Sequence, residues 1–249
     1  MTLDSYLVAA IAVVLTGISK SGFAGGLGVL GVPLVALTMS PQAAAVLLLP
    51  ILIGIDILSV WRYRTAWQAR VILTLLPGAA LGIAIGMIGF SRIDPNLLRI
   101  AIGVMALWFA ARFFRPRRKT VAPAPKANQS VIFLVSALSG FAGFVAHAGG
   151  PPIKGTLLRM GLDKSAFVGT NAVFFFTLNL AKGVGYAALG LFSVDGLLAS
   201  ATLAPFVLIG VAIGFALHKR LSQAAFLRIA YVLLAVAGLN LIVIGATAF

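Results

Sequence analysis

Long apolar stretches alternate with short polar breaks along most of the chain. Four stretches carry at most one charged residue each over about twenty positions, a length that crosses the hydrocarbon core of a bilayer as a helix. They are Pro41–Val60, Val71–Ser91, Leu197–Leu217 and Ile229–Phe249. This pattern predicts an all-α polytopic membrane protein.

Composition and charge support the same class. Of the 249 residues, 61% are hydrophobic and only 10% are charged, too few polar side chains to cover a soluble domain of this length. The net charge of +14 does not indicate a nucleic-acid partner, because most basic residues lie between the apolar stretches, as the positive-inside rule requires. There is no cysteine, and the two histidines, His147 and His218, lie far apart in sequence. We therefore expect no disulfide, no metal site and no cofactor.

A basic, proline-rich segment divides the chain into two similar halves. We predict a first transmembrane repeat over residues 1–114, a cytoplasmic linker over 115–129 and a second transmembrane repeat over 130–249. The sequence LLRIA at Leu97–Ala101 matches FLRIA at Phe226–Ala230. A proline and two glycines precede each match with the same spacing. They are Pro77, Gly82 and Gly86 in the first half and Pro205, Gly210 and Gly214 in the second. Several matches in the same order indicate a duplication.

The distribution of lysine and arginine predicts the orientation of each half. Basic residues concentrate in four regions, 62–70, 112–126, 159–164 and 219–228, which we place in the cytoplasm. Both termini are then periplasmic, and Arg92 and Arg99 are exceptions. The expected elements are a re-entrant hairpin at Tyr6–Met39, spans at Pro41–Val60, Val71–Phe90 and Leu97–Ala111, a second hairpin from Ser130 to Arg159, and spans at Ser165–Leu191, Leu197–Leu217 and Ala224–Ile244. Each half thus has one broken hairpin and three crossings, and the halves are inverted, as in many secondary transporters.

The glycine-rich stretch near the start contains a G-x-G-x-x-G pattern, Gly26–Gly31. A dinucleotide site would need a preceding strand and an acidic residue about 20 positions on, whereas this stretch lies in an apolar hairpin. We interpret it as a helix break from Lys20 to Gly31 with a restart near Pro33. The matching break is Gly143–Gly155, with a restart at Pro151 or Pro152. Broken helices at membrane depth pack in protein or line a cavity, and restarted helices present free N–H groups to anions.

Polar and glycine residues at or near these breaks are the candidate substrate ligands. Lys154 is expected in the first turn of the restarted helix, where a bound anion would offset its repulsion by the helix dipole. Asp56 and His147 are candidates for proton coupling, although Asp56 and Lys182 could instead form a structural ion pair. We assign Gly78, Gly82 and Gly86 to helix packing. The complete candidate set is Lys20, Ser21, Gly25, Gly26, His147, Gly149, Gly150, Pro151, Lys154, Asn171, Asn179 and Lys182.

Two segments carry a family resemblance. GFAGGLGVLGVPLV (Gly22–Val35) together with AHAGGPPIKGTLLRMGLDKSAFVGTNAVFF (Ala146–Phe175) resembles the TauE/SafE sulfite exporter family. The resemblance implies two related halves and transport of small organosulfur anions such as sulfite and sulfoacetate.

The expected function is therefore secondary active transport of a small organosulfur anion across the inner membrane by alternating access, with proton coupling as a further hypothesis. A passive anion channel of the same fold is the alternative. The chain shows no HExxH, no GxSxG and no paired carboxylates, so we do not expect an enzyme. The expected partners are the anion and the lipid bilayer, and the sequence is compatible with a homo-oligomer.

Overall fold

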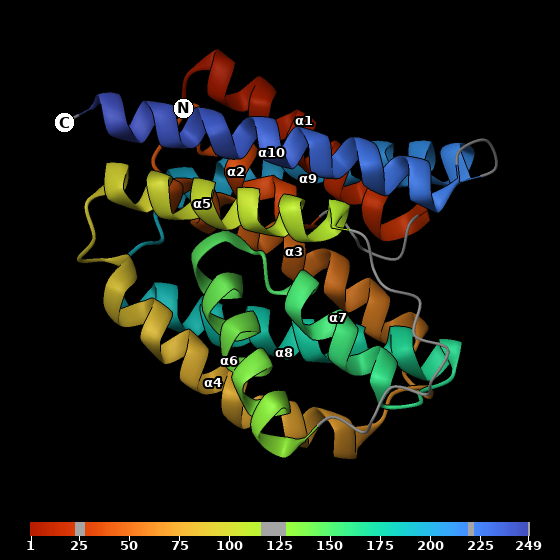
Figure 1. The fold of residues 1–249 in the computed structure, drawn as a ribbon. Coiled ribbons are helices and arrows are strands. Elements are labelled where there is room, and N and C mark those ends of the chain that lie inside the picture. Colours follow the sequence, from red (N-terminus) through yellow and green to blue (C-terminus); the bar gives the residue numbers. More distant parts are fainter. Residues whose placement is uncertain (23–27, 116–127, 219–221, 249) are drawn as a thin grey trace.

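The computed structural model describes residues 1–22, 28–115, 128–218 and 222–248, without the side chains at 20–22, 215, 218 and 223. All regular structure in these ranges is helical, as expected. The elements are α1 (Leu3–Gly22), the 3₁₀ turn η1 (Gly28–Leu30), α2 (Gly31–Val35), α3 (Pro41–Arg62), α4 (Ala69–Phe90), α5 (Pro95–Phe114), α6 (Gln129–Ala146), α7 (Gly150–Arg159), α8 (Lys164–Ala188), α9 (Val194–His218) and α10 (Gln223–Thr247) (Figure 1).

Polar residues fix where most of the long helices begin. Ser40, Asp94 and Asp163 each accept a hydrogen bond from a backbone amide in the first turn of the helix that follows, which satisfies a donor that has no partner inside the helix. The prolines at the starts of α3 and α5 lie where a missing N–H costs nothing. The predicted spans are confirmed to within a few residues.

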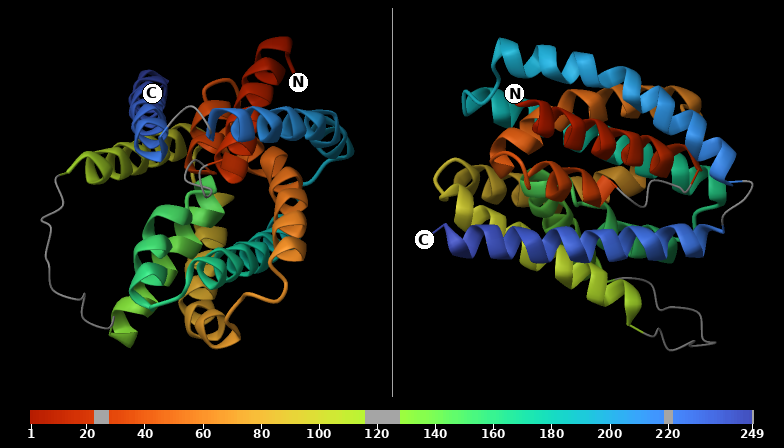
Figure 2. Two further views of the ribbon diagram at one scale, coloured as in Figure 1. Left: turned by 90° about the vertical axis from the view of Figure 1, so that its right-hand side faces the viewer. Right: turned by 90° about the horizontal axis from the view of Figure 1, so that it is seen from above.

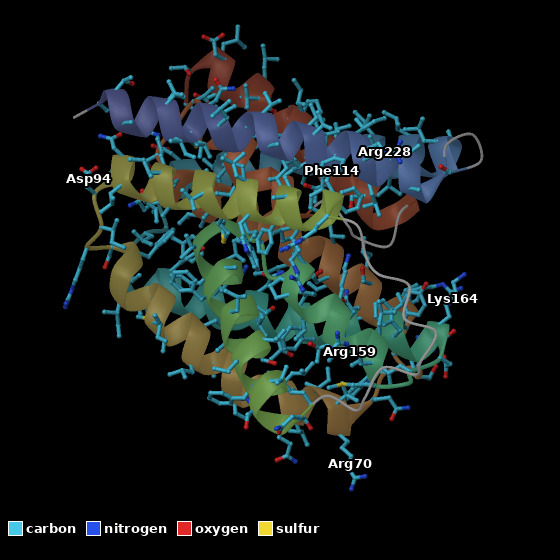
Figure 3. All side chains as sticks on the ribbon, viewed as in Figure 1. Arg70, Asp94, Phe114, Arg159, Lys164 and Arg228 are labelled. Atoms are coloured by element: carbon cyan, nitrogen blue, oxygen red, sulfur yellow. The ribbon has the colours of Figure 1, made fainter. Side chains whose placement is uncertain are left out.

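Seven of the described helices are long and apolar enough to cross a membrane, namely α3, α4, α5, α6, α8, α9 and α10. The termini (Figure 1) and Asp94 lie at one end of the helices, and Lys164 and Arg228 lie at the other (Figure 3). We call these ends the termini face and the basic face. This separation supports the orientation predicted from the basic loops.

Helices from the two halves pack against each other in pairs, α1 on α9, α4 on α6 and α5 on α10. Glycine allows the close approach. A Cβ atom at Gly82 would clash with the carbonyl of Ala137 in α6, one at Gly78 would clash with that of Phe133, and one at Gly86 would lie 3.0 Å from Cβ of Phe144. The packing role predicted for these three glycines is confirmed.

The pairing of helices follows the proposed duplication. When α1 to α5 are exchanged in order with α6 to α10, the α1–α9 contact becomes the α4–α6 contact, and α3–α8 and α5–α10 map onto themselves. This pattern supports two related halves, and their inverted orientation stays a prediction.

The second predicted helix break is present in the described backbone, whereas residues 23–27 of the first lie outside the described residues. In the first half, α1 ends at Gly22 and α2 starts at Gly31. There η1 runs directly into α2, which has only five residues, so the restart near Pro33 is present but short, and its role in anion binding stays a prediction. In the second half, α6 ends at Ala146 and α7 runs for ten residues from Gly150, slightly before the predicted restart at Pro151 or Pro152.

Candidate functional site

The second break depends on an uncommon backbone conformation at His147. Its φ of 52° lies in the left-handed region, where an L side chain costs about 1–2 kcal/mol. The amides of His147 and Ala148 donate to the carbonyl oxygens of Gly143 and Ala142, at 3.1 and 3.0 Å, and close the last turn of α6. Contacts of the histidine ring must therefore help to hold this conformation.

The imidazole ring of His147 joins two helices through both of its nitrogens. Nε2 lies 2.8 Å from the carbonyl oxygen of Ala45 in α3, and Nδ1 lies 2.6 Å from Nζ of Lys182 in α8. Because a carbonyl oxygen only accepts, Nε2 carries a hydrogen and donates to Ala45. Only one proton fits between Nδ1 and Nζ, so the hydrogen-bonded pair of His147 and Lys182 carries at most a single positive charge.

Two further polar side chains extend this contact along α8. Nδ2 of Asn179 donates to Oδ2 of Asp56 at 2.5 Å, and Nζ of Lys182 also donates to the carbonyl oxygen of Gly143 at 3.0 Å. Asn179 and Lys182 are three positions apart and share one face of α8. Asp56 is 2% exposed and Lys182 is 3% exposed, and ionisable groups buried in this way inside membrane proteins mark pathways or pairs. We call Asp56, His147, Asn179 and Lys182 the polar cluster.

The polar cluster adjoins a cavity to which both breaks contribute. The cavity is small, with a volume of about 10 Å³, which is room for about one water molecule. It is lined by Val13, Thr16, Gly28, Gly31, Leu48, Ile51, Leu52 and His147. Gly28 and Gly31 belong to the first break and His147 to the second, and η1 also lies against α7. The two breaks thus meet here, and His147 lies between the cavity and Lys182.

Four of the predicted ligands fall on parts that the structure does not describe. Gly25 and Gly26 lie outside the described residues, as do the side chains of Lys20 and Ser21. Their roles stay predictions.

Lys154 does not lie where the sequence predicted. It is the fifth residue of α7 and half-buried, because the helix starts at Gly150. Its amide therefore lies outside the first turn of α7. Only the N–H groups of the first turn of a helix lack partners within the helix. The prediction that Lys154 occupies the first turn is wrong.

The remaining candidates occupy several positions around the cluster. The carbonyl of Gly149 accepts from Oγ of Ser139 at 2.7 Å, and a Cβ atom at Gly149 would lie 2.6 Å from the carbonyl oxygen of Ser139, which gives this glycine a packing role. Gly150 and Pro151 open α7. Asn171 is half-buried, and its Oδ1 finds no hydrogen-bond partner among the described residues. It lies about 12 Å along α8 from Asn179.

Sequence reasoning missed Tyr186, which supports the break from α8. Its hydroxyl donates to the carbonyl oxygen of Phe144 at 2.5 Å, and its ring stacks on Phe90 at a centroid distance of 5.4 Å. Tyr186 follows Lys182 by one helical turn. That spacing was visible in the sequence as a signal that both residues face α6.

Comparison with known proteins gives a family. The family model for the sulfite exporter TauE/SafE matches residues 9–241. No curated protein and no solved structure matches the chain. Because the matched region covers almost the whole chain, the protein belongs to the TauE/SafE family of sulfite exporters.

Proposed function

We propose that this protein is a secondary active transporter that moves a small organosulfur anion, such as sulfite or sulfoacetate, by alternating access. The family is one of sulfite and sulfonate transporters, which supports the substrate class. The observation that carries the proposal is the polar cluster, which brings the hydrogen-bonded pair of His147 and Lys182 to the point where residues of two helix breaks meet. Interrupted helices from both halves of a transporter commonly frame its substrate site.

The proposed anion site combines a hydrogen-bond donor, a charge and a helix start. An anion in the cavity would contact His147, which lines it, and would be attracted through His147 by the charge on Lys182. The first turn of α7, which follows His147 by three positions, supplies the N–H of Gly150 and the positive end of a helix dipole; Pro151 and Pro152 have no N–H to offer. The apolar remainder of the lining keeps water from competing for these groups.

Proton coupling rests on the same four residues. The pair of His147 and Lys182 can accept a second proton at Nδ1 only if the two nitrogens separate, because both would then be donors. Entry of an anion beside His147 would favour that second positive charge. Asp56, when protonated on Oδ1, could supply this proton and then take up another from solution, while its Oδ2 accepts from Asn179. Anion and proton would then move together.

We place the protein in the inner membrane as a multi-pass protein with both termini periplasmic. The separation of Lys164 and Arg228 from the termini (Figures 1 and 3) supports this orientation through the positive-inside rule. The exchangeable helix pairs support two related repeats, over residues 1–114 and 130–249, joined by the linker at 115–129, and the distribution of basic residues supports their inversion.

Transport in proteoliposomes tests the proposal. We expect saturable uptake of labelled sulfoacetate or sulfite, counterflow from preloaded vesicles, and faster uptake under an imposed pH gradient. Empty liposomes are the control. Flux that neither saturates nor shows counterflow would identify a channel, and uptake indifferent to the pH gradient would remove proton coupling. No uptake of any organosulfur anion by folded protein would overturn the proposed function.

A further inference from the structure

Two arginines in equivalent positions of the halves have different surroundings. Arg99 of α5 is half-buried and donates from Nη2 to the carbonyl of Met39 at 3.1 Å and from Nε to that of Ala36 at 3.5 Å. Both carbonyls belong to the turn after α2, at the termini face. Arg228 of α10 is exposed, and its guanidinium has no hydrogen bond or ion pair among the described residues.

The α5–α10 pair as a whole shows the same asymmetry. It lies against η1, α2 and α3 of the first half, and it has no contact of comparable extent with α7 or α8 within the described parts of the chain. The left view of Figure 2 shows the pair beside the red and orange helices of the first half and apart from the green α7. The pairing of helices is thus symmetric between the halves, while the placement of this pair is not.

When the two halves are exchanged, the contact site of Arg99 maps onto an equivalent contact site for Arg228. Ser40 and Asp163 are the N-caps of the equivalent helices α3 and α8, so the turn after α2 corresponds to the turn after α7, and Met39 corresponds to Leu162. Arg228 would meet backbone carbonyls of residues 160–162 at the basic face just as Arg99 meets those of 36–39 at the termini face.

We propose that Arg99 and Arg228 are a matched pair of positioning residues that hold the α5–α10 pair alternately on the turn after α2 and on the turn after α7. The structure shows the state in which Arg99 is engaged. In the second state Arg99 releases the carbonyls of Ala36 and Met39, and Arg228 binds the backbone carbonyls of residues 160–162. The contact that closes the transporter thus moves from the termini face to the basic face. This inference rests on the proposed alternating access, and it names the residues that stabilise each state.

Differences between the halves account for the state that is observed. Nη1 of Arg99 donates to Oδ1 of Asn96 at 2.6 Å, which orients the guanidinium from its own helix. The residue in the corresponding position of the second half is Ala225, which offers no acceptor. The Arg99 contact is therefore better organised at rest, and the Arg228 contact needs the bound anion or a gradient to form.

The absence of cysteine from the chain makes disulfide cross-linking a direct test. Leu162→Cys with Ala224→Cys places one thiol in the turn after α7 and the other one helical turn before Arg228. Gly161 is avoided because its φ of 69° disfavours any side chain. The full-length double variant is oxidised in membrane vesicles, alone and combined with Arg99→Ala, Arg228→Ala or, as the control, exposed Arg92→Ala.

The two arginine variants should shift cross-linking in opposite directions. We expect Arg99→Ala to raise the cross-linking rate about tenfold and Arg228→Ala to lower it by a similar factor, as for loss of one charge-assisted hydrogen bond, whereas Arg92→Ala leaves it unchanged. Shifts in the same direction, or no shift in either variant, would overturn the inference. If the vesicles transport an organosulfur anion but cross-linking does not shift in opposite directions, this inference fails and the proposed function stands. If cross-linking shifts in opposite directions but no organosulfur anion is transported, the inference stands and the proposed function fails.

Discussion

Replacement of Lys182 by methionine tests whether the charge in the polar cluster attracts the anion. Methionine keeps most of the side-chain volume but removes the ammonium that contacts His147 and Gly143. An anion touching the far side of the imidazole ring would lie about 6 Å from Nζ, and at an effective dielectric constant of about 20 the lost attraction is about 2–3 kcal/mol. Anion affinity should therefore fall by roughly 30- to 150-fold. The free energy of unfolding should also fall by about 1–3 kcal/mol, because Nδ1 of His147 and the carbonyl of Gly143 lose a donor.

Calorimetric titration of the purified protein with sulfoacetate measures the affinity, and thermal unfolding measures the stability. Lys164→Met is the matched control, since Lys164 begins the same helix and is exposed. It should change neither quantity. A Lys182→Met protein that remains folded and binds sulfoacetate with the affinity of the unmodified chain would refute the role of this charge.

Three more substitutions address packing, backbone strain and coupling. Gly82→Ala should destabilise the protein by about 1–3 kcal/mol in thermal unfolding, because its Cβ would clash with the carbonyl of Ala137, whereas Gly54→Ala should be tolerated because nothing lies within 4 Å; equal effects would contradict the packing argument. His147→Gly should be about 1 kcal/mol more stable than His147→Ala, because only glycine adopts a φ of 52° without strain; the reverse order in denaturant unfolding would argue against that conformation. Asp56→Asn should leave anion binding within a few-fold of normal but make uptake insensitive to a pH gradient; retained sensitivity would remove Asp56 from coupling.

Much of the fold follows from local features of the sequence. Apolar runs of about twenty residues set the spans, and Ser40, Asp94 and Asp163 mark starts of helices by capping. The short α2 was not foreseen, because glycine and proline indicate where a helix is interrupted but not how far it continues afterwards. That length depends on where the next helix packs.

The site was predictable in part. Its members Asp56, His147, Asn179 and Lys182 stood out as polar residues in apolar surroundings, and the structure places them in two hydrogen-bonded pairs along α8. Their individual partners did not follow from the sequence, because they depend on how α3, α6 and α8 cross. The left-handed backbone conformation of His147 and the hydrogen bonds of its ring to Ala45 and Lys182 depend on tertiary packing and have no signature in the local sequence.

The contacts of Arg99 could not be predicted from the sequence either. Its position outside the basic loops made it an exception to the charge rule, and its function as a donor to two carbonyls of another segment appears only when α5 is packed against the turn after α2.

Anomalous diffraction from crystals grown with selenite, a heavier analogue of sulfite, tests most directly whether the anion binds where the two breaks meet. We expect a selenium peak in the cavity bordered by Gly28, Gly31 and His147, within hydrogen-bond reach of the histidine ring or the amide of Gly150, and loss of that peak in Lys182→Met crystals. A peak confined to the surface loops, or one at the cavity that persists at full strength without Lys182, would contradict it.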